Sequence, residues 1–403
     1  MTMAAKPTRR DFLRLAASAS IAAAGGAISQ AGEDACPRPS PAATFPRDPR
    51  RRKLILVLFG GGTRSSEAID DPQHRYVPRL SGEMVPRGTL FTNMRVEHLV
   101  VHPNCTASIK TGHWEWDDLD WSRPPAHPTF FEAFRRRHDA PDTAAWSFVY
   151  ASILAQTSLS RAAGYGERFA ANVVEPPTIP RTTAEEMDRR MARAAAGSMH
   201  AELQAARECA RLARSTSRIS TAGLRSGGAR RWFDRQYRAW KEGTGTTSHD
   251  AFLTDAAVAC MEEFSPAAIS VDFGEIDCAH YGVWSRYVDA IRRTDELTWR
   301  LWRAAERLPD YRGNTLMLIL PDHGRELDRP GHSGFIHHSN FYTNEGADEG
   351  CRRVWMLALG PGIAAGRTID RPVPITAAAA TGLDYLDLPT SPGAAPSVLD
   401  AAT

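Results

Sequence analysis

The sequence carries almost no excess charge of either sign. Its 403 residues include 49 lysines and arginines and 47 aspartates and glutamates, which leaves a formal net charge of +2. Proteins that bind the phosphates of nucleic acids usually carry a clear basic excess. The charge balance therefore gives no reason to expect a nucleic-acid partner.

Cysteines are also scarce, and none of them forms a C-x-x-C pair. Their spacing identifies no particular disulfide, although the export predicted below would place the protein where disulfides are permitted. The six cysteines are Cys36, Cys105, Cys209, Cys260, Cys278 and Cys351.

Near the N-terminus, the apolar stretch 15–28 is too short and too rich in alanine to span a bilayer, so it predicts no stable membrane anchor. It follows a twin-arginine export motif, TRRDFLR at 8–14, and precedes a signal-peptidase site after Ala31. We expect residues 1–31 to be a signal peptide that engages the twin-arginine translocase during export. The expected location of the mature protein is periplasmic or secreted.

The remaining chain divides into a linker and one large domain. Residues 32–52 are rich in proline, arginine and alanine without periodicity, and we predict a disordered linker there. Residues 53–403 are long enough to bury a sizeable core as one α/β domain. Within this domain, about 153–249 is predicted to be a helical cap insertion. Its main element would be one long helix that begins with a capping box at Thr183 and runs to about Arg214.

Continuous apolar runs predict buried parallel strands in this domain. They occupy 53–59, 267–271 and 315–320, and each ends in polar residues or glycine. Between the last two, 284–308 has apolar residues at helical spacing. The pattern predicts a mostly parallel central sheet flanked by helices.

Polar pairs follow two of these strands. Asp277 and His280 come after one strand, and Asp322 and His323 come directly after the next. Because chemistry in open α/β sheets collects at the carboxyl ends of the strands, we expect these side chains to converge there. Carboxylate oxygens with imidazole nitrogens suit zinc, manganese or iron better than calcium or magnesium. The sequence therefore predicts a divalent metal site.

The residues of this site resemble a known family. Asp277 with His280, the helix that follows, and LPDHG at 320–324 look like the second half of the alkaline phosphatase superfamily, which includes phosphodiesterases, sulfatases and phosphoglycerate mutases. Members usually space the first pair as Asp-x-x-x-His, one residue more than in this chain. The resemblance covers most of 53–388, and it implies an alkaline-phosphatase-like fold and metal-dependent hydrolysis.

The resemblance also implies a late histidine as the third ligand beside Asp277 and His280. The run GHSGFIHH at 331–338 offers candidates, and we assign the role to His338, with His337 and His332 as alternatives. Arg325, directly after the Asp-His-Gly motif, is placed to neutralise a bound anion.

The first strand departs from the resembled pattern. Members end this strand with an aspartate that binds the second metal ion, whereas Gly60 holds that place here. The second ion would then depend on Asp322 and His323. A replacement carboxylate would have to come from the acidic residues that follow, Glu67, Asp70 and Asp71.

The position of the nucleophile also departs from the resembled pattern. The segments FTN at 91–93 and TG at 111–112 are similar to the nucleophile loop and helix of sulfatases and nucleotide phosphodiesterases, whose nucleophile lies ten residues before that glycine. This count falls on His102, as metal ligand or nucleophile, and a shift of one turn brings in Thr106. Cys105 lacks the following Pro-x-Arg that formylglycine formation requires, which disfavours a formylglycine sulfatase.

These patterns together predict an exported metal-dependent hydrolase that acts on a small-molecule phosphate or sulfate ester. The cofactor would be one or two divalent ions, zinc first, with manganese or iron as alternatives. Because Gly60 and His102 stand where active relatives place essential groups, a metal- or ligand-binding protein that has lost the reaction is the rival hypothesis. A transferase of envelope phospho-groups is a third.

Overall fold

The computed structural model of the chain describes residues 45–46, 48–243, 247–338 and 349–403. The predicted signal peptide lies outside this part of the chain. Within the described ranges, no helix combines the length and the apolar character that a bilayer crossing requires.

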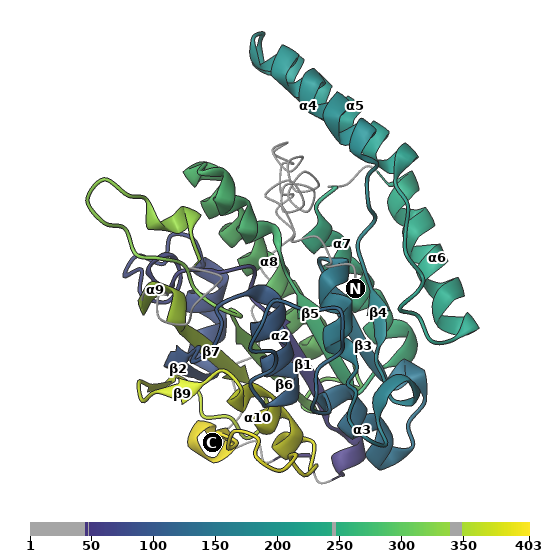
Figure 1. Cartoon of the computed structure of the whole chain (residues 1–403), viewed down its shortest axis with the longest axis vertical. Helices are drawn as coiled ribbons and strands as arrows, with labels where there is room; N and C mark the ends of the chain where they lie inside the picture. Colours follow the sequence, from purple (N-terminus) through teal and green to yellow (C-terminus); the bar gives the residue numbers. More distant parts are fainter. Residues whose placement is uncertain (1–44, 47, 244–246, 339–348) are drawn as a thin grey trace, which may run out of the picture.

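The molecule is built on one mixed sheet (Figure 1). Its strand order is β4-β3-β5-β1-β6-β7-β2-β8, and β9 pairs with β2. The strands are β1 Lys53–Leu58, β2 Thr89–Arg95, β3 Ala145–Val149, β4 Asn172–Val174, β5 Ala268–Asp272, β6 Thr315–Leu320, β7 Arg353–Leu359, β8 Arg367–Ile369 and β9 Val373–Pro374. All neighbours pair in parallel except β7, which runs antiparallel to both β6 and β2. This confirms the predicted mostly parallel sheet.

Helices cover both faces of the sheet. They are α2 His102–Thr111, α3 Phe130–His138, α4 Arg181–Ala195, α5 Met199–Thr216, α6 Gly227–Glu242, α7 His249–Phe264, α8 Trp284–Arg307, α9 Glu349–Arg352, α10 Ala377–Tyr385 and α11 Leu399–Ala402. In β1, Ile55 and Val57 enter the core shared with α7 and α8, while Leu54 and Leu56 enter the core shared with α2, α3 and α10. Burial on both faces explains why the strands are continuous apolar runs.

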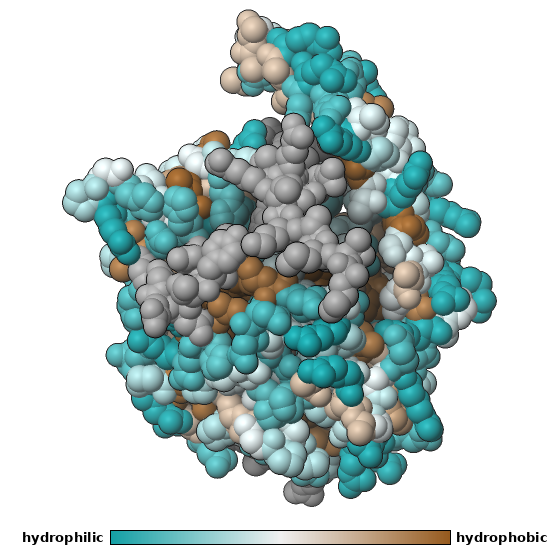
Figure 2. All heavy atoms as spheres, in the orientation of Figure 1, coloured by the Kyte–Doolittle hydropathy of each residue, from teal (hydrophilic) through white to brown (hydrophobic). Residues whose placement is uncertain are grey.

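Helices α4 and α5 form an antiparallel arm that projects from the body and has a largely hydrophilic surface (Figures 1 and 2). The prediction of one long helix here is wrong, because the chain turns back at Gly197 and Ser198 caps the start of α5 through the Ala201 amide. The predicted Thr183 capping box is not formed either, since α4 already begins at Arg181. The segment 153–249 also supplies β4 to the sheet edge, so it is not helical throughout.

The end of the segment predicted as a disordered linker packs against the domain. The rings of Phe45 and Tyr385 meet edge to face at 5.6 Å, and the Arg52 guanidinium donates to the Tyr385 carbonyl at 2.7 Å. The prediction of disorder is therefore wrong for these residues, because an aromatic ring and an arginine give them contacts that the composition of the segment does not reveal.

Candidate metal centre

The predicted site residues meet at the carboxyl edge of the sheet. Asp277 and His280 lie in η8 (Glu275–Tyr281), the short helix after β5, and Asp322 and His323 follow β6 directly. His102 is the first residue of α2, which follows β2. Strand ends that are far apart in the sequence thus deliver these side chains to one place.

One group of ligand atoms surrounds Asp277. Its Oδ1 lies 3.1 Å from His280 Nε2 and 3.6 Å from His338 Nε2. His280 Nδ1 lies 2.9 Å from the Ile336 carbonyl oxygen, which can only accept, so Nδ1 carries the proton. The lone pair of His280 Nε2 is therefore left for a ligand, as in metal sites where a carbonyl fixes the tautomer.

A second group surrounds Asp322. Its Oδ2 lies 2.6 Å from His102 Nδ1, and His323 Nε2 lies 3.0 Å from the same ring nitrogen. His323 Nδ1 donates to the Gly324 carbonyl at 2.9 Å, which again leaves the Nε2 lone pair free to bind. Asp322, His323 and His102 therefore converge on one point.

The His338 ring joins the two groups. Its centroid lies 4.4 Å from that of His280, 4.7 Å from His323 and 5.0 Å from His102. Ligand atoms of Asp277, His280 and His338 are close enough to share one ion, and so are those of His102, His323 and His338. The alternative late histidines, His332 and His337, are exposed and stack on each other at 4.9 Å.

The two carboxylates of the site increase the proton affinity of the histidine between them, and a metal ion that binds this histidine would displace that proton. Burial opposes the charge on His102, but Asp322 and Asp277 outweigh it and raise the pKa of His102 to about 10. Burial also opposes ionisation of Asp277, yet His280 and His102 hold the pKa of that carboxyl well below its usual range. Burial lowers the pKa of His323 to about 4, so its ring is neutral, as a metal ligand must be.

The buried atoms of the site that lack a hydrogen-bond partner among the described residues include His102 Nε2 and Asp322 Oδ1. Buried polar atoms of this kind usually have a partner, so each indicates a place for an additional ligand. Two carboxylates and four imidazoles form a donor set that suits zinc, manganese or iron. The residues therefore fit a divalent metal ion.

The Arg325 side chain contacts Asp277 from the buried side of the site. Its side chain is fully buried, and Nη2 donates to Asp277 Oδ1 at 2.7 Å and to the Gly61 carbonyl at 2.6 Å. Nε and Nη1 have no hydrogen-bond partner among the described residues. Arg325 thus holds Asp277 in place, and the expected contact with a bound anion stays a prediction.

The first strand ends in a tight turn with no carboxylate. Gly60 has φ +76°, and a Cβ there would lie 2.5 Å from Ile276 Cδ1. The three acidic residues considered as substitutes are paired elsewhere: Glu67 with Arg64, Asp70 with Arg353, and Asp71 with Arg75. Within the described chain, none of them supplies the missing carboxylate.

The alternative nucleophile does not join the site. Thr106 lies one turn into α2, is 1% exposed, and has no hydrogen bond to any of the converging residues in the part of the chain that is described. The Cys105 thiol beside it donates to the Leu99 carbonyl at 3.4 Å, and burial raises its pKa well above the usual range.

Sequence reasoning missed two residues, one beside His102 and one at the far end of α2. Tyr150 follows β3, and its ring meets the His102 ring edge to face at 6.1 Å; burial, with Asp277 and Asp322, raises the pKa of its phenol well above the usual range. The phenol therefore stays a hydrogen-bond donor. Lys110, at the other end of α2, is fully buried and donates to Asp272 Oδ2 at 2.7 Å. The strand-end rule could have found Tyr150, whereas nothing in the sequence indicates the partner of Lys110.

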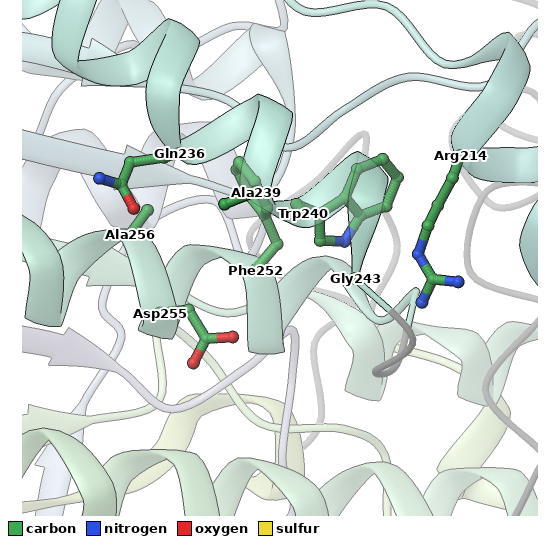
Figure 3. Close-up of a pocket in the computed structure, with 8 residues that line it drawn as sticks. All are labelled: Arg214, Gln236, Ala239, Trp240, Gly243, Phe252, Asp255 and Ala256. Atoms are coloured by element: carbon green, nitrogen blue, oxygen red, sulfur yellow. The ribbon is translucent and has the colours of Figure 1, made fainter.

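A separate hollow lies between α6, α7 and the end of α5 (Figure 3). Its volume is about 270 Å³, and its lining includes Arg214, Trp240, Phe252 and Asp255. None of the converging carboxylates and histidines lines it. The hollow is therefore separate from the cluster of carboxylates and imidazoles at the strand ends.

No protein-family description and no curated protein matches the chain. Solved structures do match it. Ps i-CgsB, in complex with k-i-k-neocarrahexaose, has 12% sequence identity and a TM-score of 0.55, over 87% of this chain and 76% of that one. The phosphonate monoester hydrolase of Agrobacterium radiobacter has 13% identity and a TM-score of 0.53, over 87% and 77%. BT1596, a 2-O GAG sulfatase, has 12% identity and a TM-score of 0.52, over 87% and 74%.

The chain therefore has the fold of these hydrolase and sulfatase structures, in agreement with the alkaline-phosphatase-like fold that the sequence motifs implied.

Proposed function

We propose that the protein is a metal-dependent hydrolase of phosphate or sulfate esters. The observation that carries this proposal is the convergence of two carboxylates and four histidines at the strand ends, with two of the imidazoles oriented by backbone carbonyls. Structures of the same fold include a phosphonate monoester hydrolase and a sulfatase, which supports an ester of phosphorus or sulfur as the substrate.

The proposed roles follow from the geometry. Asp277, His280 and His338 would hold one ion, and Asp322 and His323 would take part in holding a second. A bound divalent ion, zinc first and manganese or iron as alternatives, supplies Lewis acidity toward an ester oxygen. The chain itself orients the ligands, since the backbone carbonyls of Ile336 and Gly324 fix the rings of His280 and His323.

Two side chains would act directly on the substrate. The Tyr150 phenol, protonated at neutral pH, would donate a hydrogen bond to an oxygen of the ester. The Arg325 guanidinium has buried N-H groups without partners among the described residues, which are available to an anionic oxygen.

Export by the twin-arginine translocase, with a periplasmic or secreted location, belongs to the same proposal. It is supported by TRRDFLR at 8–14 and the short apolar stretch after it.

A protein that keeps the metal without the reaction is the second candidate. It is favoured by the first-strand turn, because Gly60 offers no carboxylate and Ile276 fills the space beside it.

One experiment separates the two candidates. The purified protein is analysed for metal and assayed with para-nitrophenyl phosphate, bis-para-nitrophenyl phosphate and para-nitrophenyl sulfate, together with Asp322→Ala and His280→Ala. A hydrolase binds metal and turns over at least one ester, and either substitution abolishes turnover. His332→Ala, on an exposed histidine outside the site, is the matched control and should keep full activity. Bound metal without turnover of any ester would favour the binding protein.

A further inference from the structure

His102 occupies the centre of the site in an unusual way. Its ring lies between the two carboxylates, with Nδ1 at 2.6 Å from Asp322 Oδ2 and Nε2 at 3.4 Å from Asp277 Oδ1. The side chain is almost completely buried, and the residue is 6% exposed. Both nitrogens of the ring therefore face groups of the proposed metal centre, and neither is open to solvent.

The glycine turn after β1 is shaped around this ring. A Cβ on Gly61 would lie 3.0 Å from His102 Cε1 and 3.4 Å from His102 Nε2. A side chain on Gly60 would meet Ile276 instead. The turn therefore leaves room for the imidazole and no room for a carboxylate of its own.

We propose that His102 is the third metal ligand beside Asp322 and His323, in place of the missing first-strand carboxylate, and that the protein consequently transfers its substrate group directly to water without a covalent intermediate. The second half of this inference rests on the proposed hydrolase function. The first half concerns metal binding alone.

The contacts of His102 oppose a nucleophilic role. A nucleophilic nitrogen needs a free lone pair aimed at the phosphorus or sulfur atom. Nδ1 is directed at Asp322 and His323, and Nε2 faces the Asp277 carboxylate, whose charge would repel an anionic ester. Since Thr106 and Cys105 also lie outside the converging groups, α2 presents no other side chain for the attack.

The step is then a single displacement. For a phosphate monoester, a water oxygen forms the new bond to phosphorus while the bond from phosphorus to the ester oxygen breaks. The proton released by the water is balanced by the proton that the leaving oxygen takes up. The products are the alcohol and inorganic phosphate.

Binding of Co²⁺ tests the ligand role without any substrate. In the metal-depleted protein, His102→Gln should weaken Co²⁺ affinity at least tenfold and reduce the visible absorption that imidazole ligation produces, as Asp322→Ala should. His332→Ala should bind Co²⁺ like the unmodified protein. For a variant that folds poorly, His102→Gly with added imidazole provides a second readout, because free imidazole should restore the cobalt absorption. Unchanged cobalt affinity and absorption in His102→Gln would overturn the inference.

Rapid quenching with ³²P-labelled para-nitrophenyl phosphate tests the absence of a covalent intermediate. We expect no labelled protein, no burst of para-nitrophenol and no transfer of phosphate to added ethanol. A base-stable phosphohistidine at position 102 would overturn the inference and leave the hydrolase function standing. Cobalt binding that depends on His102 in a protein that hydrolyses no ester would support the ligand role and refute the proposed function.

Discussion

At the scale of single residues, the site depends on the absence of a side chain at Gly61, in the turn after β1. Gly61 allows the His102 ring and the Asp277 side chain to approach the backbone, since an added Cβ would lie 3.0 Å from atoms of both. Contacts of that length force the neighbours to shift. The geometry of the proposed ligands should therefore be sensitive to one methyl group.

Gly61→Ala should reduce ester turnover at least tenfold and lower the free energy of unfolding by about 1–3 kcal/mol, because it overpacks the site. Turnover and urea unfolding measure the two effects. Gly82→Ala is the matched control, since a Cβ there has nothing within 4 Å and should change neither quantity. Unaltered turnover in Gly61→Ala would contradict the tight fit.

Sequence reasoning worked for residues placed by a simple rule. Asp277 and Asp322 follow apolar strands, and the strand-end rule puts them together. The same rule says nothing of which late histidine turns inward, and in the structure it is His338 that lies buried, at 2% exposure. That choice depends on the path of a loop, and loop paths follow from tertiary contacts more than from local sequence.

At the scale of elements, α2 is held at both ends. His102 starts the helix in the site, and one residue before its end Lys110 donates to Asp272 at the end of β5, and also to Ser147 and Thr157. This buried ion pair fixes the helix relative to the strands that carry the other converging side chains.

Lys110→Met should lower the free energy of unfolding by about 3–5 kcal/mol, because it leaves the Asp272 carboxylate buried without its partner. Adding Asp272→Leu should recover most of that loss, since the pair would then be replaced by apolar groups. Denaturant unfolding of the single and double variants is the measurement. Equal stability of Lys110→Met and the unmodified protein would show that the pair does not anchor α2.

The arm formed by α4 and α5 is a second separable element. Its apolar contacts are a small cluster of its own around Met187, Cys209 and Ala213, and its base is closed by paired backbone hydrogen bonds between Thr178 and Arg218. An apolar cluster of that size stabilises the arm but adds little to the main core.

Replacing residues 181–216 by a short glycine linker should therefore leave the thermal midpoint within a few degrees of the original. Turnover of para-nitrophenyl esters should also be retained, because the arm supplies none of the converging residues. A collapse of the thermal midpoint would show that the arm is part of the folding core.

The predicted single helix in this region was wrong because one glycine and one serine reverse the chain, and a periodic apolar pattern continues across such a break.

At the scale of the whole molecule, the fold was more predictable than the site. Long apolar runs buried on both faces, such as β1 and β6, determine a parallel sheet almost by themselves. The edge strand β4 has only three residues, too few to produce a pattern.

Stability should fall in mild acid through His113. Burial, with a contribution from the stacked His127 ring at 3.7 Å, lowers the pKa of His113 to about 4. The unfolded chain binds this proton below about pH 6.5, whereas the folded chain does not until about pH 4, so stability is full above 6.5 and is lost as the pH falls toward 4.

The measurement is the thermal midpoint between pH 7 and pH 4.5. His113→Gln, which keeps a polar group near Ser391 Oγ, should show a smaller fall over this interval than the unmodified protein. Exposed His332→Gln controls for histidine content, and Glu115 should remain paired with His127 in all variants. Identical pH profiles for His113→Gln and the unmodified protein would refute the assignment.

The wide spacing of the converging side chains along the chain has a further consequence. His102 and Asp322 are 220 positions apart, yet they touch at the same point. An ion bound between them would act as a reversible cross-link that closes a very long loop, and closing such a loop removes much of the freedom of the unfolded chain. Removal of the metal should therefore also affect regions far from the site, and the whole sheet should unfold faster and be cleaved more easily by proteases.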